Sequence, residues 1–320
     1  MKALVSRCAA LAAALAPCVA AAAAVTIDHD EAKHQIAIAV DGKTAIVYSH
    51  EPDHFLPYFH PVNSPSGKEL TVKLTKPYPH HRSFWFTDKV QLKGQKVTDF
   101  YNAYYSYKGG KGHHIRHDKV LEATASGERA NLRLRLIWEI DADTSVLEET
   151  RDIAFLALGD GEYFIDIRFT VTAAYGDVDF VSDGTHYAWP YVRMHPQFSV
   201  QKGGTLINSE GGENQKGTHN REARWCDYTN TIEGVTEGLG FFSHSENAQP
   251  HRWLTRDYGC FGPRRIDARS GKRFTVAKGE SLTRRIGILV HKGDAEAGKV
   301  AERYREYTEG KLGLLPAVSR

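Results

Sequence analysis

The chain has 320 residues, with 41 Lys and Arg against 39 Asp and Glu, and only 4 cysteines. A formal charge of +2 lacks the basic excess that general nucleic-acid binding uses. Four cysteines are also too few to frame a disulfide-dense scaffold of this length.

The first element in chain order is a predicted signal peptide over residues 1–24. Lys2 and Arg7 precede an apolar Ala/Leu stretch, and Ala-rich sequence with A-x-A cleavage options follows. This run is too short for a membrane span, so the sequence predicts a periplasmic or secreted protein. Removing 24 of 320 residues leaves 296, with no formal net charge and all 16 histidines. Leu15 to Cys18 resembles a lipobox with a poorly fitting proline, so lipid anchoring through Cys18 is the alternative.

Most of the patterned segments that follow alternate apolar and polar residues, as half-buried β-strands do. The predicted strands are His34–Val40, Glu69–Thr75, Ala130–Ile140, Tyr163–Thr172 and Ser281–His291. Gly-rich turn signals separate them, and no other apolar run is long enough to span a membrane.

One segment near 294–309 has the pattern of a helix. Asp294 is a plausible N-cap, Val300, Tyr304 and Tyr307 share one face, and Gly310 follows as a stop. Many strands without intervening helices predict an all-β fold, a large antiparallel β-sandwich with a short C-terminal helix. Residues 25–320 are expected to form a single domain.

Histidine, arginine and aromatic residues gather in a few short runs. The densest contains His80, His81, Arg82 and Trp85, and others lie around His60, around His186, and from His251 to Gly259. Imidazoles transfer protons near neutral pH, guanidinium groups bind oxyanions, and Trp or Tyr rings suit sugar rings. This inventory is typical of a site for a polar small molecule or an oligosaccharide.

Four stretches of the chain resemble ordered blocks of the bacterial family named PmoA-like, or "methane oxygenase PmoA". They are HPVNSPSGKELT, PYPHHRSFWF, the NSEG…ARWCDY region and HRWLTRDYGCFG, which together span about His60 to Gly262. The resemblance implies a secreted or periplasmic β-sandwich, similar in architecture to galactose mutarotase and set in carbohydrate metabolism. The residues in the matched blocks are His60, His80, His81, Arg82, Trp85, Glu210, Arg224, Trp225, Asp227, Arg252, Trp253, Asp257 and Tyr258.

The leading hypothesis is an isomerase, lyase or hydrolase that acts on a sugar-derived substrate by histidine-centred acid/base chemistry. The expected catalytic residues are His80, His81, His186 and Asp257. The expected substrate-binding residues are His60, Arg82, Trp85, Arg252, Trp253 and Tyr258. The main alternative is a non-catalytic glycan-binding module, and Arg252 and Asp257 could instead form a structural ion pair.

No cofactor is predicted, and the alternative is a metal-dependent oxygenase, as the family name suggests. His113, His114 and His117 have the compact spacing that a copper or zinc site would need, in a Gly-flanked segment. An exposed histidine-rich loop explains the same spacing. Cys226 and Cys260 could pair in an oxidising compartment or remain buried thiols, and the sequence leaves both open.

Overall fold

Two large antiparallel sheets form the body of the protein. The computed structural model describes residues 23–181, 188–248, 251–265 and 273–317. In spatial order, the long sheet contains β10 (His114–Ser126), β11 (Arg129–Asp141), β12 (Thr144–Gly159), β13 (Glu162–Thr172), β22 (Ser281–Lys292), β18 (Val235–Ser243), β17 (Trp225–Ile232) and β16 (Thr205–Asn208).

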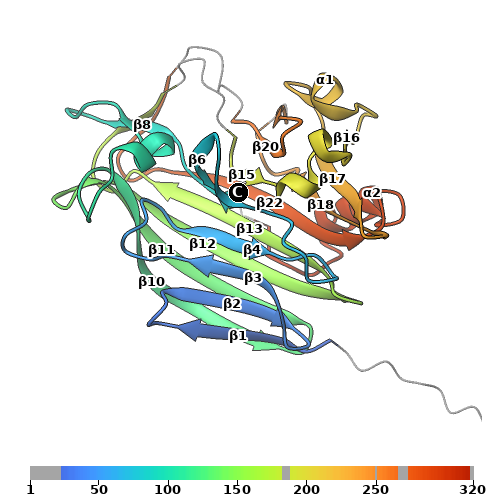
Figure 1. Cartoon of the computed structure of the whole chain (residues 1–320). Coiled ribbons are helices and arrows are strands. Elements are labelled where there is room, and N and C mark those ends of the chain that lie inside the picture. The colour runs from blue at the N-terminus through green and yellow to red at the C-terminus, as the bar shows by residue number, and fades with distance from the viewer. Residues whose placement is uncertain (1–22, 182–187, 249–250, 266–272, 318–320) are drawn as a thin grey trace, which may run out of the picture.

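The second sheet also has eight strands, and in Figure 1 it lies over one face of the first sheet. Their spatial order is β1 (Val25–Asp30), β2 (Gln35–Val40), β3 (Lys43–Ser49), β4 (Tyr58–Val62), β7 (Phe84–Trp85), β15 (Tyr191–Arg193), β20 (Cys260–Pro263) and β19 (Trp253–Thr255). This order mixes early and late segments of the chain, so β4, β7, β15 and β20 become neighbours.

Two small sheets and a few short helices complete the structure. One sheet contains β21 (Phe274–Val276), β14 (Val178–Phe180), β8 (Lys89–Leu92) and β9 (Thr98–Asp99), and the other pairs β5 (Lys73–Thr75) with β6 (Tyr78–Arg82). The helices are α1 (Asn214–Thr218), α2 (Val300–Thr308) and the 3-10 turns η1 (Phe100–Tyr105), η2 (Pro196–Phe198) and η3 (Val200–Lys202).

The core forms because alternate side chains of both sheets point into the space between them. Ile36, Ile38 and Ile46 of the second sheet meet Leu132 and Ile165 of the long sheet in one cluster. The predicted all-β sandwich is therefore confirmed. Among the described segments, none of the helices combines the length and apolarity of a bilayer-spanning segment.

Four of the five predicted strands are confirmed, and the one at Glu69–Thr75 is mostly wrong. Only Lys73–Thr75 forms a strand there, while Glu69 and Thr71 make isolated bridges to Asn63 and Met194. Burial does not follow the alternating pattern, since Leu74 is exposed and Thr71 is buried, and the backbone pairs too briefly with any one neighbour to form a ladder.

The C-terminal helix begins later than predicted, at Val300 instead of near residue 294. The Asp294 carboxylate accepts hydrogen bonds from the backbone N–H groups of Glu296 and Ala297, within the turn that precedes the helix. Asp294 therefore stabilises a turn and is not the N-cap. The helix packs Val300, Tyr304 and Tyr307 against the outer face of the long sheet.

Candidate functional site

Four of the predicted site residues come together because β6 and β7 follow each other closely in the chain. β6 carries His80, His81 and Arg82, and β7 carries Trp85. All four side chains are buried. Figure 1 shows β6 beside β15 and β20 on one side of the long sheet.

The two histidines are joined by tyrosines of η1. His80 Nδ1 lies 3.1 Å from the Tyr105 hydroxyl, and its Nε2 lies 3.3 Å from the Tyr101 hydroxyl. The same Tyr101 hydroxyl lies 3.2 Å from His81 Nε2. These contacts form a hydrogen-bonded chain, here called the His–Tyr relay, from the exposed Tyr105 through His80 and Tyr101 to the buried His81.

Burial keeps both histidines of the relay neutral at neutral pH. It lowers the pKa of His80 to about 4, with a further contribution from the nearby Arg82 cation. It lowers the pKa of His81 to about 2, where His80 and Arg193 add to the effect. The relay can therefore pass a proton along its hydrogen bonds but does not store a positive charge.

His81 also belongs to a column of stacked rings. Its ring centroid lies 5.0 Å from that of Tyr78 and 5.2 Å from that of Trp85. Tyr78 in turn lies 5.0 Å from the Tyr258 ring, and the guanidinium carbon of Arg193 lies 4.5 Å from the centre of the Tyr258 ring. The column runs from the buried Trp85 to residues that line a pocket.

That pocket has a volume of about 350 Å³ and is here called the tyrosine pocket. Its lining residues are Thr75, Lys76, Pro77, Tyr78, Arg193, Pro196, Ser199, Gln201, Lys202 and Tyr258. Tyr78 and Tyr258 both contribute their rings to the column. The pocket therefore offers hydroxyl, amide and cationic groups to a ligand, with His81 directly behind Tyr78.

Arg82 lies beside this site but faces other rings. Its guanidinium carbon is 4.7 Å from the centre of the Phe55 ring and 5.3 Å from that of Tyr104, and Nη1 donates to the Pro79 carbonyl. Burial lowers its pKa. Arg82 is held among aromatic rings and does not line the tyrosine pocket.

The late run of predicted residues does not assemble as one unit. Arg252 is on the surface and pairs with Glu222, whereas Trp253 is fully buried and donates to the Ala223 carbonyl. The Asp257 carboxylate accepts from the Gln215 backbone N–H and so connects its loop to α1. The alternative of an Arg252–Asp257 ion pair is therefore wrong, and only Tyr258 of this run reaches the tyrosine pocket.

Two further predicted residues lie elsewhere. His60 on β4 has Lys73 and His195 as its charged neighbours, and burial lowers its pKa to about 4. His186 falls outside the residues that the structure describes. The predicted signal segment also falls almost wholly outside them, so secretion stays a prediction.

The three histidines proposed as an alternative metal site do not converge. His113 contacts the Asp99 carbonyl, His114 lies 3.1 Å from a Glu139 oxygen, and His117 lies 3.1 Å from the Tyr48 hydroxyl. Across the described ranges, no group of three or more His, Cys, Asp or Glu side chains is placed to hold a metal ion.

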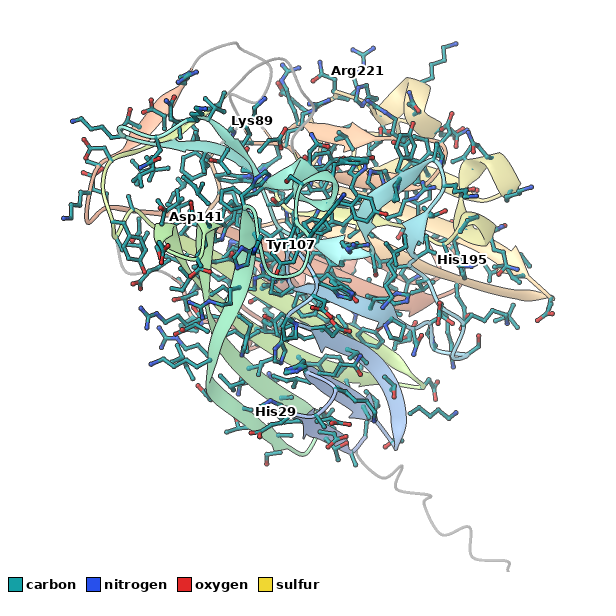
Figure 2. The ribbon with its side chains drawn as sticks, turned by 60° about the vertical axis from the view of Figure 1, so that its left-hand side comes forward. His29, Lys89, Tyr107, Asp141, His195 and Arg221 are labelled. Carbon is teal, nitrogen blue, oxygen red and sulfur yellow. The ribbon has the colours of Figure 1, made fainter. Side chains whose placement is uncertain are left out.

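His114 and His117 instead line a second pocket of about 440 Å³, here called the histidine pocket, with His34, His50, His54 and Tyr107. The His50 and His117 rings lie 4.1 Å apart, and burial lowers their pKa values to about 4 and about 3. Figure 2 shows Tyr107 well apart from His195, which precedes Pro196 of the tyrosine pocket, so the two pockets occupy different places.

Sequence reasoning missed Arg193, Tyr101 and Tyr105. The tyrosine-rich run from Tyr101 to Tyr107 was a signal that could have been noticed. Nothing beside Arg193 in the sequence marks it, because its neighbours in the pocket come from distant segments.

A family profile matches residues 35–305 of the chain, and its family is described as a family of unknown function, DUF6807. The chain belongs to this family. No curated protein matches it.

Solved structures resemble the chain only distantly. A GH36 α-galactosidase of Geobacillus stearothermophilus has a TM-score of 0.47 and 10% identity, over 85% of this chain and 42% of its own. An α-galactosidase from Lactobacillus brevis has a TM-score of 0.39 and 9% identity, over 87% of this chain and 41% of its own. A polysaccharide lyase has a TM-score of 0.38 and 11% identity, over 89% of this chain and 35% of its own. The DUF6807 chain thus spans less than half the length of these structures.

Proposed function

We propose that this DUF6807 protein binds a sugar-derived ligand in the tyrosine pocket and transfers protons to or from it through the His–Tyr relay. One observation carries the proposal: Tyr78 and Tyr258 line a pocket, and the Tyr78 ring is stacked directly on His81. Sugars are recognised by several hydrogen bonds from well-held polar groups, and a volume of about 350 Å³ suits a small ligand.

The relay supplies the acid/base part of the proposal. Neutral imidazoles both donate and accept hydrogen bonds, so a proton can move along the relay as far as His81, whose Nδ1 is buried and has no hydrogen-bond partner in the described chain. A ligand in the tyrosine pocket would exchange a proton with the relay by contacting that nitrogen. His80 is the central member because both of its ring nitrogens contact tyrosine hydroxyls. This chemistry serves mutarotation, epimerisation or elimination on a sugar.

A non-catalytic glycan-binding module is the second candidate, and one observation favours it. Neither histidine of the relay lines the tyrosine pocket, and none of its lining residues is Asp, Glu or His. A ligand would then be held by tyrosine, arginine and amide groups without a proton donor in direct contact.

The test is a sugar panel measured for both binding and turnover with the full chain. Tyr78→Phe and Tyr258→Phe keep the ring column but remove the hydroxyls, and each should weaken binding roughly threefold to tenfold, the range for one hydrogen bond. His80→Gln should leave binding within about twofold and remove turnover. Binding without turnover in the wild-type protein would support the glycan-binding module, and absence of any sugar binding would contradict both candidates.

A further inference from the structure

In the part of the chain that the structure describes, Arg193 is a buried cation without a carboxylate partner. The residue is 4% exposed and lies at the end of β15. Its Nη1 donates to the Tyr258 carbonyl, its Nε has no hydrogen-bond partner, and its guanidinium carbon lies over the Tyr258 ring. Burial lowers its pKa. Keeping a positive charge away from water lowers the stability of the folded protein unless an anion binds to that charge.

Three other buried arginines have that anion within the protein. Arg151 pairs with Glu149, Arg265 with Asp88, and Arg285 with Asp166. Within the described ranges, Arg82 and Arg284 form no ion pair either. Arg82 is held among aromatic rings, the Arg284 guanidinium donates to the Trp189 carbonyl and the Ser243 hydroxyl, and neither arginine lines the tyrosine pocket or the histidine pocket. Arg193 differs from these arginines because it is buried, has a nitrogen without a hydrogen-bond partner and also lines a pocket.

The charge of the tyrosine pocket has one sign. Lys76 and Lys202 line it together with Arg193, and no Asp or Glu is among its lining residues. Both lysines are exposed. Three cations around one cavity favour an anionic ligand and repel a cationic one.

We propose that the tyrosine pocket selects a sugar that carries an anionic group. Arg193 and the two lysines bind the anion, while the hydroxyls of Tyr78 and Tyr258 bind the ring. The shared chemistry is a sugar-borne oxyanion, either a ring carboxylate, as in a uronic acid, or a phosphate or sulfate ester. This inference rests on the proposed function and narrows its substrate class.

Matched pairs of ligands test the inference by isothermal titration calorimetry. D-Glucuronate is compared with D-glucose, and D-galacturonate with D-galactose, so that each pair differs at a single carbon. We expect the acid of at least one pair to bind roughly tenfold tighter or more, the effect of a charge-assisted hydrogen bond, and raised salt to reduce the difference. Glucose phosphate and glucose sulfate esters form a third arm, and tight binding of these alone would assign the anion to an ester.

Variants identify the residues responsible. The double variant Lys76→Ala/Lys202→Ala changes only exposed side chains and should lose most of the preference for the acid. The control Lys93→Ala/Lys278→Ala removes the same charge from two exposed lysines beside Asp177, outside the pocket, and should keep the preference. Arg193→Gln should abolish the preference, and circular dichroism verifies that this buried variant is folded.

The outcomes separate the two proposals. Equal binding of neutral and anionic sugars would overturn the anion inference and leave the proposed function standing. No binding of any sugar would overturn the proposed function itself. Anion preference that persists in the double variant and in a folded Arg193→Gln would place the anion site elsewhere and so contradict the inference.

Discussion

Adjacent residues of one strand segment have opposite roles because their side chains point to opposite sides. The Arg252 side chain is 44% exposed and pairs with the similarly exposed Glu222. Trp253 is fully buried, lies 5.7 Å from the Phe241 ring and donates from Nε1 to the Ala223 carbonyl at 2.8 Å. At the residue scale, Trp253 supports the core and Arg252 does not.

We expect Trp253→Ala to lower the free energy of unfolding by about 3–5 kcal/mol, since it leaves a large cavity and an unpaired carbonyl. Arg252→Ala should change it by less than about 1 kcal/mol, because exposed ion pairs contribute little. Urea denaturation followed by tryptophan fluorescence and circular dichroism measures both. Similar losses for the two variants would contradict this division.

At the scale of elements, α2 packs on the outer face of the long sheet. Close packing requires a position beneath the helix where the sheet carries no side chain. Gly287 of β22 lies beneath this helix, opposite Phe242 on β18 and Asp166 on β13. A Cβ atom at Gly287 would lie 2.5 Å from Phe164 Cζ and 3.0 Å from Tyr307 Cε1. The missing side chain of Gly287 therefore makes the close packing of helix and sheet possible.

Gly287→Ala should lower the free energy of unfolding by about 1–3 kcal/mol, the usual range for overpacking a dense core. Ser281→Ala, at the exposed start of the same strand, is the matched control and should stay within about 0.5 kcal/mol of the wild type. Thermal melts and limited proteolysis near α2 provide the measurements. An unchanged Gly287→Ala protein would show that the helix shifts freely on the sheet.

At the scale of the whole molecule, the histidines make the fold sensitive to acid. Burial is the main reason why seven of them have pKa values of about 4 or lower: His50, His60, His80, His81, His117, His244 and His251. The ordinary value is 6.5. His291 opposes this trend: burial lowers its pKa, but Asp227 at 2.9 Å outweighs it and the net shift is upward.

The free energy of unfolding should therefore fall as pH drops from about 6.5 to about 4. In this window the unfolded chain binds protons that the folded histidines do not accept, and the state that binds more protons gains stability as pH falls. Urea titrations at several pH values measure the slope, and NMR titration of the imidazole protons assigns it to residues. A flat or rising stability toward pH 4 would contradict the burial of these rings.

The alternation of apolar and polar residues was sufficient to predict the strands that form long ladders. It was insufficient to predict which residues form the candidate site. Leu132, Leu134 and Trp138 alternate with polar residues on β11, and that alternation alone places them in the core. His80 and His81 were recognisable as a polar cluster, but their tyrosine partners come from η1, about twenty residues on. Cys226 and Cys260 illustrate the same limit, since both are buried free thiols.

By itself, the sequence determined the all-β sandwich, most of the long strands and the gathering of histidines beside arginine and tryptophan in β6 and β7. These properties follow from side-chain periodicity and from residues close in the chain. Only the tertiary structure decided that Arg193 and Tyr258 meet Tyr78, that Arg252 and Asp257 do not pair, and that His114 and His117 line a separate pocket. The physical reason is that sheet order joins β7, β15 and β20 across long stretches of sequence, and no local pattern encodes which distant strands become neighbours.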